Sequence, residues 1–382
     1  MKTILSICLL GTCLFSSAQS TNHSFVHQTV TRNYIVHLPP GYPDGSAYSL
    51  VINMHGYGTN GNLQESLFEM SPVADTGNFI VVYPDGISAS WNAGQLWSYA
   101  TGIDDVSFIS TLIDTMVANY TIDTNRVYAT GMSNGGFMSY RLACELADKI
   151  AAIASVTGVM SDSVYNSCQT SRPVPVMHMH GTTDPTVDYN GDTGQQSVDS
   201  CISYWVQRNN CSPTPVVTAI PDIVTSDNCT ADKFVYGGGD DNSEVVFFKI
   251  TNGGHTWPGG PDLSGFGYGY TNMDFIANGE IWLFFRKHTL PTPTAVSEHI
   301  KTRKPSLSIW PNPGSDMVVL GGVDLKKSVV TVVNLLGQVV IEKPLSNTSG
   351  SASLDISNLE KGVYVIKVAN TRETLTEVLV KQ

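Results

Sequence analysis

The stretch Arg126–Leu142 reads RVYATGMSNGGFMSYRL and decides the fold of the chain. A β-forming run, Val127–Thr130, leads into GMSNGG at 131–136, and a run that favours a helix follows. Glycines two residues to either side of a serine permit a tight strand-to-helix turn, because a Cβ there would collide with neighbouring elements. The pattern predicts that Ser133 is a nucleophile held at the end of a sheet, with the N–H of Asn134 available to an oxyanion.

Composition indicates a globular, exported protein. Of the 382 residues, 42% are hydrophobic and 14% are charged, so Ser, Thr, Asn and Gly must supply much of the polar surface. The net charge of −12 argues against nucleic acid or an anionic membrane as a partner. Residues 1–18 read as a signal peptide, in which Lys2 precedes an apolar stretch too short to span a bilayer and small residues form the cleavage site. We therefore expect no stable membrane insertion.

Five of the seven cysteines lie beyond the signal peptide. Export permits disulfide bonds, and an odd number leaves at least one thiol unpaired. We expect the pairs Cys144–Cys168 and Cys211–Cys229, with Cys201 left over in an apolar helical stretch. No C-x-x-C pair occurs, which argues against a zinc site built on cysteine.

Buried apolar runs alternate with helical segments up to residue 287, and this alternation predicts an α/β domain with a mostly parallel central sheet. A helix is expected over 106–120, capped by Asp104 or Asp105. The expected strands are 33–38, 49–54, 79–83, 127–130, 151–157, 174–179 and 245–250.

The pattern changes after this domain, which we place at residues 19–287. Prolines at 291, 293 and 305 mark residues 288–305 as a linker. Residues 306–382 show short alternating runs separated by turn signals, which predict a small all-β sandwich. Its expected strands are 318–320, 329–334, 339–342, 363–368 and 375–380.

A serine nucleophile needs a base and an orienting acid, and both have candidates at the ends of later strands. Asp184 follows the run 174–179, just past the carboxyl end of a buried strand, where parallel sheets carry their chemistry. Asp188 is a competitor four residues on. His255 stands in NGGHTWPGG at 252–260, among glycines that a loop needs to hold an imidazole near a serine.

Other residues have weaker claims. A second oxyanion donor should follow an early strand, where HGYG at 55–58 offers the N–H of Tyr57, with His55 more structural than catalytic. Trp91 and Trp257 are candidate substrate-binding residues, and Trp97 shares the loop of Trp91. His178 and His180 share one strand face, but no third ligand is evident, so we read them as core and strand-end residues and expect no metal.

From about residue 28 to 287 the chain resembles the polyhydroxybutyrate depolymerase and feruloyl esterase family, secreted α/β-hydrolases related to carbohydrate esterase family one. The motifs that carry the likeness, in order, are MHGYGTNG, WNAG, DDVSFI, YATGMSNGGFMSYRLAC, HMHGTTDPTVDYNG and GGHTWPGG. The resemblance implies Ser133 as nucleophile, Asp184 and His255 as its partners, and Tyr57 and Asn134 as oxyanion donors, with no cofactor. The family pattern near Asp188 more often has a proline, so this chain keeps a second carboxylate near the acid.

The last eighty or so residues resemble a type IX secretion C-terminal sorting domain. SIWPNPGSDMVVL, VTVVNLLGQVV, LDISNLEKGVYVIKV and the terminal LVKQ carry this likeness. It implies export across an outer membrane by the type IX machinery, with the protein secreted or held at the cell surface.

Together these features predict a secreted serine esterase that forms an acyl-enzyme. Feruloyl or acetyl esters of plant cell-wall polysaccharide are the expected substrates, and polyhydroxybutyrate or its oligomers are the alternative. Two other classes stay open: a serine peptidase, which amide turnover would reveal, and a non-catalytic surface-binding protein, which a serine-directed phosphonate would not label.

Overall fold

The structure is a computed structural model that describes residues 18–95, 102–291, 307–321, 325, 328–334, 337–345, 351–370 and 374–382. The predicted signal peptide up to residue 17, Trp97 and residues 292–305 of the predicted linker lie outside these residues. The chain divides into two compact units, Met1–Thr292 and Pro293–Gln382, which are taken in turn.

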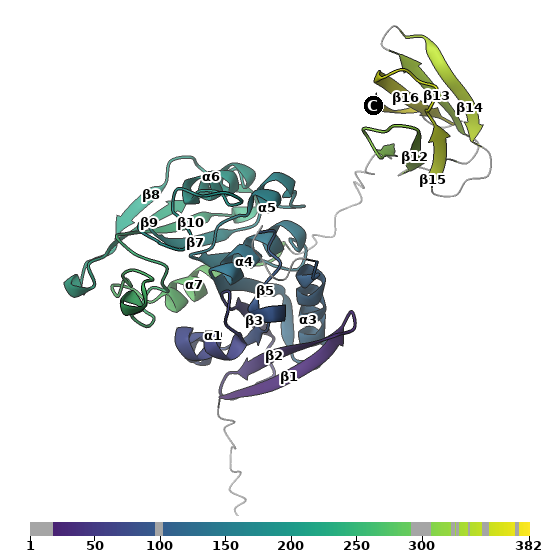
Figure 1. Cartoon of the computed structure of the whole chain (residues 1–382). Coiled ribbons are helices and arrows are strands. Elements are labelled where there is room, and N and C mark those ends of the chain that lie inside the picture. The colour runs from purple at the N-terminus through teal and green to yellow at the C-terminus, as the bar shows by residue number, and fades with distance from the viewer. Residues whose placement is uncertain are drawn as a thin grey trace, which may run out of the picture. The chain divides into compact units, whose positions relative to one another are not determined.

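A ten-stranded sheet forms the centre of the first unit (Figure 1). Its strand order is β1-β2-β4-β3-β5-β6-β7-β10-β9-β8. The inner strands pair in parallel, namely β4 (Phe79–Pro84), β3 (Tyr48–Met54), β5 (Ile122–Met132), β6 (Ala152–Val156), β7 (Val176–Gly181) and β10 (Val245–Thr251). The prediction of an α/β fold with a mostly parallel sheet is confirmed.

Antiparallel strands complete both edges of the sheet: β1 (Gln19–His27) and β2 (Val30–Leu38) at one edge, β9 (Thr230–Tyr236) and β8 (Val216–Ala219) at the other. Of these four, the hydrophobic pattern predicted only β2. Every residue of β8 is exposed, and β1 alternates between exposed and half-buried positions, so neither strand has the buried run that marks the inner strands.

Helices cover both faces of the sheet (Figure 1). Helices α3 (Asp105–Asn119), α4 (Asn134–Glu145) and α6 (Val198–Arg208) contribute to one buried core, and α2 (Met70–Gly77) and α7 (Ala277–Phe285) to the other. The Asp104 carboxylate caps α3 by accepting from the N–H of Ser107. The other helical elements of this unit are α1 (Gly61–Phe68), α5 (Asp162–Ser167), η1 (Ile87–Ala89), η2 (Thr225–Asp227), η3 (Asp240–Asn242) and η4 (Ser264–Phe266).

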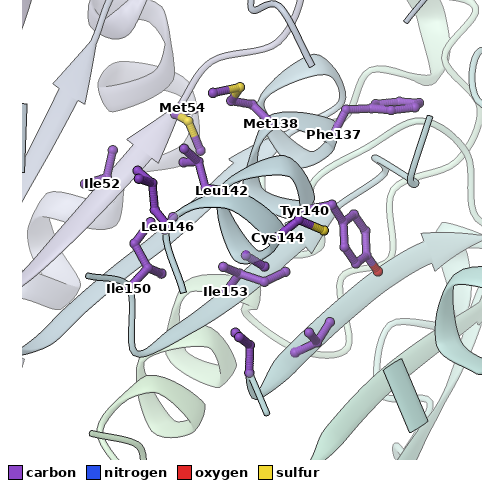
Figure 2. Packing of buried hydrophobic residues seen from close by; sticks show 14 of the residues in the cluster. Ile52, Met54, Phe137, Met138, Tyr140, Leu142, Cys144, Leu146, Ile150 and Ile153 are labelled. Atoms are coloured by element: carbon purple, nitrogen blue, oxygen red, sulfur yellow. The ribbon is translucent and has the colours of Figure 1, made fainter. Parts of the chain in front are cut away.

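Strand β3 shows how the two cores are separated. Ile52 and Met54 belong to the core under α4, together with Leu142 of that helix and Leu146 directly after it (Figure 2). Val51 points the other way and belongs to the opposite core. A strand with all its residues buried in this way must be apolar on both faces, which explains the continuous run in the sequence.

The cysteine predictions have a mixed outcome. Cys144 of α4 bonds to Cys168, which follows α5, as expected, and Cys201 is a buried free thiol in α6. The expected Cys211–Cys229 bond is wrong, because both residues are free. Cys211 belongs to the core that contains α4 and Cys229 to the core on the opposite face of the sheet, so the sheet separates the two sulfurs.

A buried ion pair fixes the start of α3. Arg32 of β2 is 2% exposed and donates to Asp105 at 2.7 Å, with its guanidinium 3.6 Å from the ring centre of Phe108. The other oxygen of Asp105 accepts from the backbone N–H of Asn92 at 2.7 Å. Burial lowers the pKa of Arg32 and raises that of Asp105, and their mutual attraction opposes both effects. The pair thereby ties β2, α3 and the loop around Asn92 together.

We expect Asp105→Asn to lower the free energy of unfolding by about 3–5 kcal/mol, because it leaves a guanidinium buried without its counter-charge. Urea denaturation of the full chain measures this loss. The matched control is Asp114→Asn, which removes a carboxylate that is 66% exposed and bonded to Lys149, and should cost no more than about 1 kcal/mol. Equal losses for the two variants would contradict this account of Asp105.

The second unit is all-β, which confirms the prediction for this region. One antiparallel sheet has the order β11 (Ser308–Trp310), β12 (Met317–Gly321), β15 (Ser351–Asp355). The other has the order β14 (Val339–Leu345), β13 (Ser328–Asn334), β16 (Gly362–Ala369), β17 (Thr374–Lys381). Both sheets bury residues in one apolar core. Across the described parts of both units, no helix combines the length and apolarity that spanning a membrane requires.

Candidate active site

Ser133 occupies the turn between β5 and α4 with φ 53° and ψ −118°, a conformation that non-glycine residues adopt at a cost in strain. The flanking glycines are required by the close approach of β3. A Cβ at Gly131 would stand 2.5 Å from the carbonyl oxygen of Met54, and one at Gly135 would overlap the same oxygen. The predicted strand–turn–helix context is therefore present.

The two expected oxyanion donors, Tyr57 and Asn134, belong to segments that lie next to Ser133. Asn134 begins α4, where the first backbone N–H groups have no earlier helical carbonyl to bond and the helix dipole favours negative charge. The segment that follows β3 runs beside the serine, since a Cβ on Gly56 would lie 3.5 Å from the Cβ of Ser133. Tyr57 follows Gly56, so its backbone is close to the site.

Asp184 and His255 meet beyond the ends of β7 and β10. His255 Nδ1 and Asp184 Oδ2 are 2.8 Å apart, and both side chains are buried. The second carboxylate oxygen of Asp184 accepts from the N–H groups of Thr186 and Val187 at 2.8 and 2.9 Å. Burial favours a raised pKa for Asp184, but the hydrogen bond and charge of His255, together with His180 and the N–H of Val187, hold that pKa below its ordinary value.

Ser133 and His255 line one cavity of about 230 Å³. Its walls are mostly apolar and come from the segment after β3, from α1 and from the segment around η4. The apolar side chains among its lining residues are Tyr57, Leu63, Leu67, Phe68, Met132, Leu263 and Tyr268. None of the three leucines was predicted from the sequence, although Leu63 and Leu67 share a helix face at a spacing of four and are about two-fifths exposed.

The expectation that Trp91 and Trp257 bind substrate needs correction. Both are fully buried, and neither lines this cavity. Trp257 donates to Asn278 and stacks on Phe68, so it supports the cavity wall from behind. Apolar loop aromatics look alike in sequence whether they face a ligand or the core.

Trp91 instead connects the segments that carry the two expected oxyanion donors. Its indole N–H donates to the carbonyl of His55 at 3.0 Å, and its backbone N–H donates to the side-chain oxygen of Asn134 at 2.6 Å. The amide nitrogen of Asn134 donates back to the Trp91 carbonyl at 3.1 Å. The tryptophan thus fixes the spacing of the loop after β3 and the start of α4.

The remaining histidines near the site are buried. His55 donates from Nδ1 to the carbonyl of Gly56 at 2.8 Å and accepts from the N–H of Gly86 at Nε2. His178 and His180 on β7 are 0% exposed and lie within hydrogen-bond distance of each other. Within the part of the chain that the structure covers, no three His, Cys, Asp or Glu side chains gather as metal ligands would.

The fold and the site define an α/β-hydrolase with a serine, histidine and aspartate at the carboxyl ends of its parallel strands. Residues 42–212 match the phospholipase/carboxylesterase family, and residues 308–382 match the secretion system C-terminal sorting domain. Both matches agree with the resemblances drawn from the motifs, to an α/β-hydrolase in the first unit and to a sorting domain of the type IX secretion route in the tail. This tail implies export to the cell surface or the extracellular space.

Several relatives carry esterase names. A bifunctional acetylxylan esterase/xylanase of Neocallimastix patriciarum is 28% identical over 71% of this chain and 35% of its own length. Feruloyl esterase B of Piromyces equi is 30% identical over 59% of this chain and 42% of its own. Feruloyl esterase D of Neurospora crassa is 31% identical over 49% of this chain and 65% of its own. The chain thus spans less than half the length of the first two relatives.

Proposed function

We propose that this protein is a secreted serine esterase that hydrolyses carboxylic esters through an acyl-enzyme. The contact between Asp184 and His255 beside the strained Ser133, with all three at the ends of parallel strands, carries the proposal. The family match and the esterase names of several relatives support the same class of reaction.

In this mechanism Ser133 Oγ attacks the ester carbonyl and His255 takes its proton. The N–H groups of Tyr57 and Asn134 hold the oxyanion. His255 then returns the proton to the departing alcohol, and water attacks the acyl-enzyme in a second round. Asp184 keeps the imidazole in the tautomer that presents Nε2 to the serine and stabilises the imidazolium.

The shape and polarity of the cavity favour an aromatic acyl group. Its walls carry three leucines, a phenylalanine and two tyrosines, and a planar phenyl-propenoyl group would bury its ring against them. An acetyl group would leave most of this apolar surface in contact with water, and a hydroxybutyryl group would bring a hydroxyl to walls with few polar partners. We therefore favour feruloyl esters of plant cell-wall polysaccharide over acetyl esters and over polyhydroxybutyrate.

Turnover of methyl ferulate, acetylated xylan and a hydroxybutyrate oligomer, each compared with Ser133→Ala, tests the function. We expect release of ferulate to exceed that of acetate or hydroxybutyrate, and the variant to lose on the order of 10⁶-fold in kcat with its melting temperature little changed. Turnover of the oligomer alone would make the protein a polyester hydrolase. The esterase assignment is rejected if no substrate reacts and a serine-directed phosphonate leaves Ser133 unlabelled.

The two carboxylates after β7 should differ sharply. Asp184→Asn should lower kcat about 10⁴-fold, because the asparagine amide disfavours the Nδ1–H tautomer of His255. Asp188→Asn should leave kcat within about twofold, since Asp188 is exposed and bonds only within its own turn, to Asn190. Initial rates on methyl ferulate measure both. A large loss of kcat in Asp188→Asn would instead assign the role of the acid to Asp188.

The acyl pocket can be tested with two esters of the same alcohol. Leu67→Ala should lower kcat/KM for methyl ferulate by about tenfold, since a few methylenes of pocket contact are lost, and should leave kcat/KM for methyl acetate nearly unchanged. Leu283→Ala is the matched control, because Leu283 is similarly exposed on α7 but does not line the cavity. An equal loss on both esters would place the acyl group elsewhere.

A further inference from the structure

A chain of buried hydrogen bonds runs from α4 through β7 to the acid of the site. Tyr140 Oη lies 2.8 Å from His178 Nδ1, and His178 Nε2 lies 3.1 Å from His180 Nδ1. His180 Nε2 is 2.9 Å from the carbonyl oxygen of Val187 and 3.4 Å from Asp184 Oδ2. Tyr140, His178 and His180 are each 0% exposed. None of the three takes part in the mechanism above.

The carbonyl of Val187 determines which atom donates in each hydrogen bond of this chain. A carbonyl oxygen can only accept, so Nε2 of His180 must carry the proton, and in the neutral ring its Nδ1 must then accept. Nε2 of His178 is therefore the donor to His180, and Nδ1 of His178 accepts from the hydroxyl of Tyr140. Figure 2 shows the Tyr140 ring leaving α4 with its hydroxyl oxygen at the far end.

Both rings are held neutral by their surroundings. Burial lowers the pKa of His178 well below the ordinary histidine value, and the neighbouring ring of His180 adds to this effect. Burial also lowers the pKa of His180, although the charge of Asp184 opposes the shift. Phe247 packs near His178, and Tyr189 meets His180 edge-on, so the pair lies in a mostly apolar layer.

His180 supports Asp184 from two sides. Its Nε2–H holds the carbonyl of Val187, the same residue whose N–H donates to Asp184 Oδ1 at 2.9 Å. The same proton also lies near Asp184 Oδ2, the oxygen that faces His255. The 3.4 Å separation is longer than an ordinary hydrogen bond, so this second interaction is mainly electrostatic.

We propose that His180 is a positioning residue for Asp184, and that His178 and Tyr140 lock His180 in the one tautomer that can donate toward the acid. The inference rests on the proposed serine esterase mechanism and adds three residues to it. None of them touches the substrate. Their task is to keep the carboxylate turned toward His255 while remaining uncharged themselves.

Two substitutions at position 180 test this role. His180→Leu removes the donor, and we expect kcat on methyl ferulate to fall about 10- to 100-fold with KM within about twofold, because a misplaced orienting group costs that much. In His180→Gln the side-chain Nε2 amide can occupy the place of the imidazole Nε2–H. This variant should recover kcat to within about threefold of the parent.

Rates are expressed per active site titrated with a serine-directed phosphonate, so that loss of folded protein does not register as loss of kcat. His37→Leu, at a buried histidine that bonds Asp75 and Ser20 instead, should leave this normalised kcat unchanged. An unchanged kcat in His180→Leu would overturn the proposal. Equal losses in the leucine and glutamine variants would also overturn it, because the site would then need the ring shape and not the donor.

A second measurement uses the unaltered chain and does not depend on turnover. Long-range ¹H–¹⁵N correlation spectra of the histidine rings should show His178 and His180 as neutral Nε2–H tautomers at about pH 7, since burial lowers both pKa values. A charged ring or an Nδ1–H tautomer at either position would refute the chain. If the parent hydrolyses no ester, the proposed function fails, while these spectra still decide the tautomers.

Discussion

The site depends on the close approach of β3 to the turn between β5 and α4. The carbonyl of Met54 leaves no room for a Cβ at Gly131 or Gly135, and this lack of space holds Ser133 at φ 53°. The same approach brings the segment after β3, with Gly56 and Tyr57, alongside the serine. One steric constraint therefore positions the proposed nucleophile and the segment that holds a proposed backbone donor.

The loop that contains Trp91 and Asn92 connects the buried ion pair to the segments around Ser133. Trp91 donates hydrogen bonds to the carbonyl of His55 and to the side-chain oxygen of Asn134. The next residue, Asn92, donates from its backbone N–H to the buried Asp105. The ion pair between Arg32 and Asp105 thus anchors the loop that connects the segment after β3 to the start of α4. Its cost of burial is offset by several charged hydrogen bonds, which is the condition under which such pairs are tolerated.

Sequence predicted the inner strands and the residues at their ends, because strands buried on both faces give continuous apolar runs and catalytic residues follow them directly. The sequence could not show whether Trp91 and Trp257 lie in the core or line a pocket. Both lie in loops that contain glycine, and such a loop is compatible with either position. The expected Cys211–Cys229 bond failed for a related reason. Only the packing of the folded chain shows that Cys211 belongs to the core on one face of the sheet and Cys229 to the core on the other.

His255, His180 and His178 differ in their access to the cavity. His255 lines the cavity with Ser133, so its ring can exchange a proton with a substrate. His178 and His180 have no exposed surface, and burial keeps them neutral. A charged His180 would pair with Asp184 and weaken the charge that His255 needs as it becomes an imidazolium. A neutral donor orients the carboxylate without consuming its charge, and an apolar layer is the environment that keeps histidine in that state.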